Sequence, residues 1–162
     1  MLTKFETLVN TIRTNYRFFK VITKEDSKFM KFLFKIMLMK YWNPRFMEDY
    51  TTVILHNVYM PKRLINTGSG YAVLRHEYIH IKDAYKTGII PFFVSYTVLL
   101  PFVFTFRAFW EWRAYKESLR VDMETYGAIH ESRITQIVKE FTGSQYLWMC
   151  PFPKFCKPPR DV

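Results

Sequence analysis

The chain has 162 residues, of which 49% are hydrophobic and 19% are aromatic. A chain of this length can bury the core of one domain, and this composition excludes a disordered protein. The net charge of +10 suits a nucleic-acid, anionic-lipid or acidic-polymer partner, although solubility alone can explain it. The first twenty residues lack the apolar core of a signal peptide, so nothing in the sequence directs the chain to secretion.

Two helices are predicted in the N-terminal part of the chain. Apolar residues recur three and four positions apart over 2–22, which is the pattern of an amphipathic helix. A second helix is expected after Asp26 or Ser27, both good N-cap residues, and should run to about Tyr41 before Pro44 ends it. Its lysines share one face, which favours a core helix with a lysine-covered outer face over a basic helix lying on a membrane. These lysines are Lys28, Lys31 and Lys35.

Residues 51–60 are the best strand or hairpin candidate, because they are rich in β-branched and aromatic side chains. Asn57 is expected at a bulge or turn, and Pro61 ends the run. A glycine-containing loop at 67–70 then leads into a helix over about 71–85. Gly88 fits the C-terminal cap of that helix.

The helix at 71–85 contains the most specific motif of the chain, His76-Glu77-Tyr78-Ile79-His80. Two histidines four residues apart project from the same side of a helix, so both imidazoles can bind one metal ion. Glu77 lies beside that face, where it can hold a metal-activated water without being a ligand. This HExxH pattern predicts a zinc site. The alternative is a surface helix that happens to carry two histidines.

Residues 87–106 contain no charged residue, which makes them a candidate membrane span by length. A span would carry the chain about 30 Å from the motif helix, and Glu111 could then not return to the metal. Pro91 and Pro101 also interrupt the segment. We therefore expect buried helix pieces or an interface patch, with membrane insertion as the less favoured alternative.

Helices are predicted over 107–126 and 128–141, followed by an extended, proline-rich tail over 143–162. Catalytic zinc usually takes three protein ligands, and the first of these helices offers Glu111 and Glu117 as the third. The alternative for Glu111 is an exposed carboxylate that pairs with a nearby cation of its own helix.

Cys150 and Cys156 are weaker candidates for the third ligand, because they lie in the proline-rich tail. Five residues between two cysteines is not a usual zinc spacing, and two cysteines are too few for a disulfide framework. Reduced thiols are therefore expected at both positions.

A zinc hydrolase would use Glu77 as the general base that takes a proton from the zinc-activated water. It would also need an orienting group or oxyanion donor, for which Tyr115 and His130 are candidates, with Tyr85 as a further one. An extended peptide substrate is expected to pair with the edge of the strand at 51–59, where His56 is an ordinary strand residue. The residues expected to make that pairing are Val53, Leu55 and Asn57.

Four segments of the chain carry a family resemblance: Val58-Tyr-Met-Pro61, Leu74-Arg-His-Glu-Tyr-Ile-His80, Trp110-Glu-Trp-Arg-Ala-Tyr-Lys-Glu-Ser-Leu-Arg120 and Phe141-Thr-Gly-Ser-Gln-Tyr-Leu-Trp-Met-Cys-Pro-Phe152. Together they resemble a family of small zincin-like proteins of the gluzincin type, found in bacteria and in tailed bacteriophages. The specific parts are the HExxH motif and Glu111-Trp-Arg-Ala114, which is similar to the E-x-x-A segment that supplies the third ligand in gluzincins.

The resemblance covers roughly residues 45–155 and implies zinc binding by His76, His80 and Glu111. Tyr115 departs from the pattern, since much of that group has an aspartate there that orients a ligating histidine. The expected fold is α+β and mainly helical. It is zincin-like, with a short antiparallel strand pair before the motif helix and a ligand helix after it. The chain is expected to be a single domain over 1–162, comprising N-terminal helices (1–44), a metal-site core (45–142) and the tail (143–162).

Two functions of different classes compete. The first is a zinc metallopeptidase that acts on a peptide or cell-wall substrate. The second is a structural or interaction protein on a zincin scaffold, such as a bacteriophage virion or tail component that docks through its apolar segment 87–106. Membrane and nucleic-acid partners are less favoured, and the expected location is cytoplasmic or virion-associated.

Overall fold

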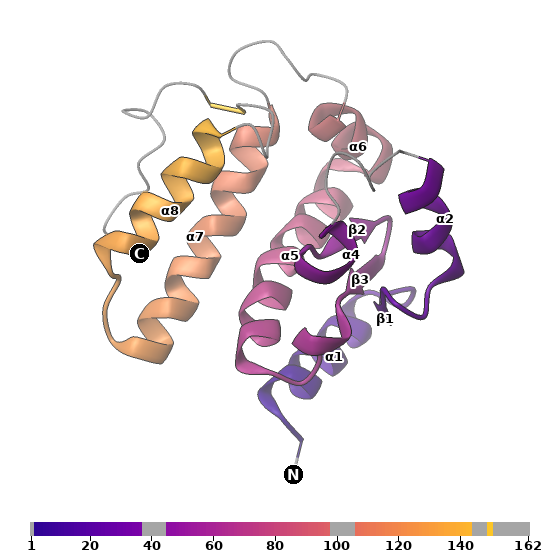
Figure 1. Cartoon of the computed structure of the whole chain (residues 1–162), viewed down its shortest axis with the longest axis horizontal. Helices are drawn as coiled ribbons and strands as arrows, with labels where there is room; N and C mark the ends of the chain where they lie inside the picture. Colours follow the sequence, from indigo (N-terminus) through magenta and orange to yellow (C-terminus); the bar gives the residue numbers. More distant parts are fainter. Residues whose placement is uncertain (1, 37–44, 98–105, 144–148, 151–162) are drawn as a thin grey trace. The chain divides into compact units, whose positions relative to one another are not determined.

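A computed structural model describes residues 2–36, 45–97, 106–143 and 149–150. They form a mainly helical α+β structure with seven α-helices, one 3-10 helix and a small mixed sheet, which confirms the expected fold class at that level. The contacts divide the chain into two compact units, Met1–Glu77 and Tyr78–Val162. Figure 1 shows the helices and strands of both. Whether the arrangement is that of a zincin stays a prediction.

The first unit contains a three-stranded sheet with the strand order β1-β3-β2. The strands β2 (Thr52–Ile54) and β3 (Asn57–Met60) pair antiparallel, so the predicted hairpin is confirmed. The turn between them falls at Leu55, whose φ of 56° is left-handed, and Asn57 opens β3. His56 also lies in this turn rather than in a strand, with its ring 6.0 Å from that of Phe18.

The strand β1 (Lys20–Thr23) pairs parallel with β3 and was not expected. The predicted helix over 2–22 is therefore too long, because helix α1 covers only Lys4–Asn15. The apolar spacing continues past α1, but the β-branched residues Val21, Ile22 and Thr23 extend along β3 instead. This partner lies more than thirty residues away, and pairing with it outweighs the local helical pattern.

Helix α2 (Lys28–Ile36) follows Ser27, whose side chain accepts a hydrogen bond from the backbone N–H of Met30 at 3.2 Å. Met30 is fully buried and packs with Phe46 of the short helix α4 (Phe46–Asp49). The expected end of α2 near residue 41 lies outside the described residues. Three apolar side chains of this predicted core helix do not face the core. Phe29, Phe32 and Ile36 are exposed.

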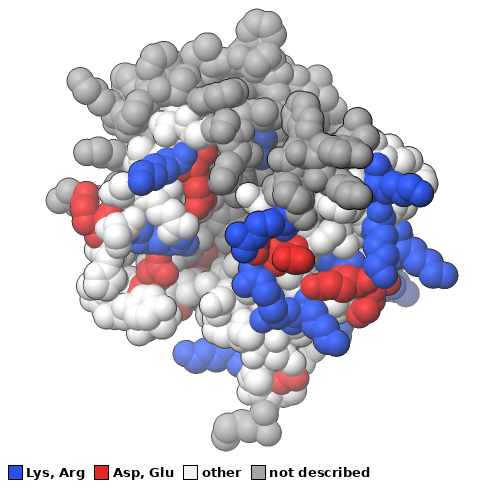
Figure 2. Space-filling model, viewed as in Figure 1, with Lys and Arg blue, Asp and Glu red and all other residues white. Residues whose placement is uncertain are grey.

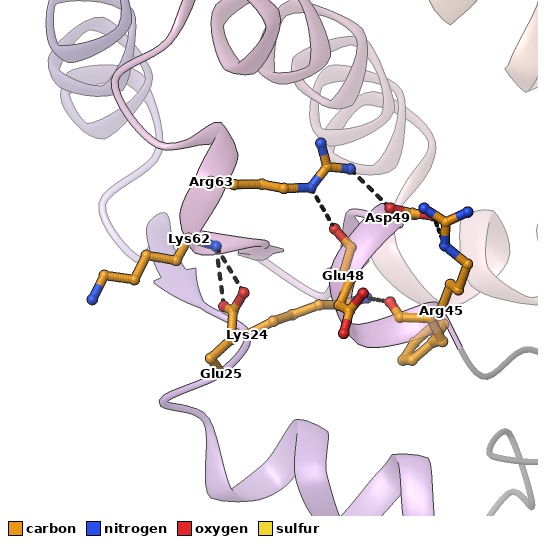
Figure 3. A network of polar contacts seen from close by, with 8 residues as sticks. Lys24, Glu25, Arg45, Glu48, Asp49, Lys62 and Arg63 are labelled. Atoms are coloured by element: carbon orange, nitrogen blue, oxygen red, sulfur yellow. Dashed lines mark hydrogen bonds and ion pairs between the residues drawn. The ribbon is translucent and has the colours of Figure 1, made fainter.

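A polar network joins the segments around the sheet (Figure 3). Both carboxylate oxygens of Glu25 accept hydrogen bonds from the backbone N–H of Lys62, at the start of the 3-10 helix η1 (Lys62–Leu64). Arg63 donates to the Glu48 carbonyl and to the Asp49 carboxylate, each at 3.0 Å. These bonds hold η1 against α4, directly ahead of the helix that carries the HExxH motif.

That helix, α5, covers Gly68–Thr87 and so begins three residues earlier than predicted. The side chain of Thr67 caps it by accepting a hydrogen bond from the Gly70 N–H at 2.9 Å. Gly70 lies so close to η1 that a Cβ there would stand 1.8 Å from the carbonyl oxygen of Leu64. Gly88, with a φ of 95°, follows the last residue of α5, as expected for its C-terminal cap.

The second unit continues with α6 (Ile89–Thr97), α7 (Phe106–Tyr126) and α8 (Glu131–Thr142). Figure 1 shows α7 and α8 side by side. Their shared core includes Leu119 from α7 and Ile137 and Phe141 from α8, all at most 1% exposed. An ion pair of 3.1 Å between Arg133 and Asp122 joins the same two helices.

The apolar segment 87–106 contains α6, so the prediction of a helix piece is confirmed for its first half, and 98–105 lie outside the described residues. Ile90, Phe93 and Val94 of this piece are 76%, 61% and 44% exposed, so they are not buried, and the predicted alternative of an interface patch stays a prediction. Among the described residues, no helix combines the length and apolar character needed to cross a bilayer.

Candidate metal centre

His76, His80 and Glu111 form the one group of three or more His, Cys, Asp or Glu side chains in the described part of the chain that could hold a metal ion. One potential ligand atom from each lies within 4.8 Å of the other two. The Nε2 atom of His80 is 3.7 Å from Oε2 of Glu111. His80 and Glu111 are only 6% and 3% exposed and are therefore shielded from water, whereas His76 is partly exposed.

Helix α5 carries both histidines on one side. Leu74 and Ile81 are at most 1% exposed on another side of the helix, and His80 is also buried. His76 and His80 stand four residues apart and therefore project from the same side, about one turn from each other. The expected pairing of the two imidazoles on one helix face is thus present in the structure.

Within the second unit, an ion pair holds α7 beside the last turns of α5. Arg113 contacts both carboxylate oxygens of Asp83 at 2.9 Å, and Asp83 is 2% exposed. Asp83 lies one turn after His80, and Arg113 lies two residues after Glu111. The small side chain of Ala114 is fully buried, as expected of a residue that lets two helices approach closely. These contacts fix the position of the Glu111 carboxylate against His80.

Helix α6 places aromatic side chains next to the Glu111 carboxylate. The hydroxyl of Tyr96 donates a hydrogen bond to Oε1 of Glu111. The Tyr96 ring lies edge-on to the His80 ring, with the ring centroids 5.7 Å apart. Phe92 packs against Tyr96 and against Trp110, whose indole N–H donates to Ser95 at 3.1 Å. Tyr96 thus orients one oxygen of Glu111 and leaves the other toward the histidine.

The spacing of these atoms fits a metal ion. Tetrahedral zinc with ligands at about 2.0–2.1 Å separates its ligand atoms by roughly 3.4 Å. The 3.7 Å between His80 and Glu111 is close to that value, and the 4.8 Å limit for the whole group requires only small side-chain rotations. The alternative predicted for Glu111, an exposed carboxylate, is excluded by its burial.

The ammonium group of Lys24 is a buried cation in the first unit of the chain, which also contains Glu77. Its side chain is 0% exposed, and its Nζ donates to the Phe46 carbonyl at 2.8 Å and lies 3.6 Å from the centre of the Phe46 ring (Figure 3). Burial lowers the pKa of Lys24 from 10.5 to about 8, and the carboxylates of Glu25 and Glu77 partly oppose that shift. Lys24 therefore acts electrostatically on the carboxylate next to His76.

Other candidate residues lie apart from this group. The Tyr115 hydroxyl donates to Glu140, and its ring packs on Phe141 in the core between α7 and α8. His130 is exposed at the start of α8, and Tyr85 is 39% exposed. Glu117 pairs with Arg120 at 3.2 Å. Of the predicted substrate-pairing residues, Val53 lies on the edge strand β2, Leu55 lies in the turn, and Asn57 lies on β3, whose two edges are both paired.

The expectation of reduced thiols is wrong at Cys150, which is disulfide-bonded. The only other cysteine, Cys156, lies outside the described residues. The small number of cysteines argued against a framework of several bridges, but it did not exclude a single bridge. A disulfide sulfur is not a thiolate, so Cys150 is removed from the candidates for the third ligand.

Tyr96, Asp83 and Arg113 are the site residues that the sequence analysis missed. Tyr96 stands in an apolar segment that was considered as a whole, and nothing in that segment singles it out. Asp83 gave a usable signal, because a residue three positions after His80 lies on the same side of the helix. No protein-family model, no curated protein and no solved structure matches this chain. The chain has a candidate metal site at His76, His80 and Glu111.

Proposed function

We propose that the protein is a zinc-dependent hydrolase, and specifically a metallopeptidase. The observation that carries this proposal is the grouping of His76, His80 and Glu111, with Glu77 directly after the first histidine. Two imidazoles and one carboxylate are a ligand set that catalytic zinc uses when a further position stays open for water or substrate. Zinc bound there would supply Lewis acidity toward a carbonyl and toward water.

Side chains of the protein would carry out the remaining steps of the reaction. Glu77 is the general base, which takes a proton from the attacking water at its carboxylate and passes it to the leaving amine. The buried Lys24 side chain interacts electrostatically with the Glu77 carboxylate. Tyr96 and the Asp83–Arg113 pair hold Glu111 in place and so preorganise the ligands. The edge of β2 at Val53 offers backbone groups for an extended substrate.

The test combines metal analysis with peptide hydrolysis. The wild-type protein should contain about one zinc per chain by elemental analysis and should cleave members of a mixed peptide library, detected by mass spectrometry. Glu77→Gln should keep the zinc and lose cleavage by about 10²- to 10⁴-fold, the usual contribution of a general base. Glu48→Gln, at an exposed glutamate of the first unit, is the matched control.

Two results would contradict the proposal: a protein that binds no metal, or cleavage that proceeds at the same rate in Glu77→Gln. Two histidines and a carboxylate also suit Fe(II), so the identity of the metal is part of the measurement. Iron in place of zinc, with no hydrolysis of peptides, would point to a different chemistry at the same residues.

A second candidate function is a structural or interaction role in a larger assembly such as a virion. It is favoured by the exposed side chains of Ile90, Phe93 and Val94, which share one face of α6. Light scattering coupled to size-exclusion chromatography tests it. Self-association that Ile90→Ser and Val94→Ser abolish would support this role, and a wild-type monomer that hydrolyses peptides would count against it.

A further inference from the structure

Helix α2 exposes a stripe of large apolar side chains. Phe29, Phe32 and Ile36 are 48%, 60% and 59% exposed. They stand three and four residues apart and therefore share one face of the helix. A different face carries Met30, which is 0% exposed and belongs to the core. Phe32 and Ile36 thus lie apart from the side that anchors the helix, while the Phe29 ring at the start of the stripe lies 6.1 Å from the Tyr59 ring of that core. Exposed apolar side chains grouped in this way mark a contact surface.

A basic stripe runs beside the apolar one. Lys28, Lys31 and Lys35 follow the same spacing, so they form a neighbouring face of α2. The helix contains no acidic residue of its own. Figure 2 shows basic side chains gathered over α2, at the right of the view. Three ammonium groups therefore stand next to three apolar side chains on one exposed surface.

Contacts within the chain hold helix α2, and therefore both stripes, in place before any partner binds. Ser27 caps its first turn, and the backbone N–H of Lys31 donates to the Ser27 carbonyl at 3.1 Å. Phe34 stacks on Phe46 with the ring centroids 6.3 Å apart, and Leu33 packs against the same core cluster. A partner that binds this surface would not have to order the helix first, which lowers the cost of binding.

We propose that α2 is a docking surface for an anionic lipid bilayer. In this arrangement the Phe29–Phe32–Ile36 stripe enters the boundary between headgroups and acyl chains, and the lysines meet the lipid phosphates. Each lysine near an anionic membrane strengthens binding about fivefold. A nucleic acid would use the lysines but would leave the apolar stripe in water. The combination of both stripes, together with the net charge of +10, favours lipid.

The experiment measures co-sedimentation of the full chain with vesicles of phosphatidylcholine alone or mixed with phosphatidylserine. The wild-type protein should bind the anionic vesicles and not the neutral ones. Phe32→Ser with Ile36→Ser keeps the charge and should weaken binding at least about tenfold. Both positions are exposed, so the core is untouched, and circular dichroism confirms that each variant is folded.

Charge-reversal variants distinguish membrane binding through α2 from binding caused by the overall positive charge of the chain. Lys31→Glu with Lys35→Glu should weaken binding by more than about 25-fold. Lys86→Glu with Lys139→Glu changes the net charge equally at exposed positions elsewhere and should weaken it far less. The proposal is overturned if neither vesicle is bound, or if both charge reversals weaken binding equally. It is also overturned if duplex DNA is bound instead, with no loss in the Phe32→Ser, Ile36→Ser variant.

Discussion

Lys24→Met should remove a pH dependence of stability that arises from burying a cation. The Lys24 side chain is 0% exposed, and burial lowers its pKa from 10.5 to about 8. Between these two values the unfolded chain still holds the proton that the folded protein has released. The free energy of unfolding therefore rises with pH across that window. Because one pKa unit corresponds to about 1.4 kcal/mol, the rise should be about 3 kcal/mol for this lysine.

Urea unfolding followed by circular dichroism, at a series of pH values from below 8 to 10.5, measures the effect. The quantity to compare is the difference in unfolding free energy between the wild type and Lys24→Met, because other groups that titrate in this range cancel in it. That difference should shift by about 3 kcal/mol in favour of the wild type as the pH rises. Lys139→Met, at an exposed lysine, is the control and should show no such shift. Parallel curves for the wild type and Lys24→Met would refute the reasoning.

Tyr96→Phe keeps the ring contacts but removes the hydroxyl that donates a hydrogen bond to Glu111. The zinc affinity should therefore fall about tenfold, measured by competition with a chromophoric chelator. An unchanged zinc Kd would mean that Tyr96 does not orient Glu111. Gly70→Ala should destabilise the fold by at least about 1–3 kcal/mol in urea unfolding, because the new Cβ would meet the Leu64 carbonyl oxygen at 1.8 Å. Gly68→Ala, with nothing within 4 Å of its Cβ, should be neutral or stabilising, and equal effects of the two substitutions would contradict this explanation.

The sequence predicted the parts of the structure that local patterns control. The spacing of His76 and His80 indicated a shared helix face, and Gly88 indicated the cap of that helix. The β-branched and aromatic composition of 51–60 indicated the hairpin, although its turn falls at Leu55 and His56 rather than at Asn57. The expected third ligand, Glu111, also lies in the group that the structure brings together. Each of these predictions depends on residues within one or two helical turns of each other, or on a short motif.

The features that were missed depend on partners distant in the sequence. β1 forms because β3 is available to pair with it, and the helical spacing of its own residues pointed elsewhere. The bond from Tyr96 to Glu111 spans two helices, and the apolar segment around Tyr96 gave no reason to select it. For a related reason, the sequence favoured a core helix at α2 over one with an exposed amphipathic face. Periodicity shows that a helix has apolar faces, but it does not show which of them the rest of the chain covers.

Zinc binding by Glu111 tests the central claim most directly. The measurement is the zinc content and the zinc Kd of the wild-type protein and of two variants in α7, Glu111→Gln and Glu117→Gln, which remove the same charge from the same helix. The wild type and Glu117→Gln should bind about one zinc per chain with similar affinity, and Glu111→Gln should bind it at least about tenfold more weakly. Equal affinities in all three proteins, or no stoichiometric zinc in the wild type, would contradict a metal site at His76, His80 and Glu111.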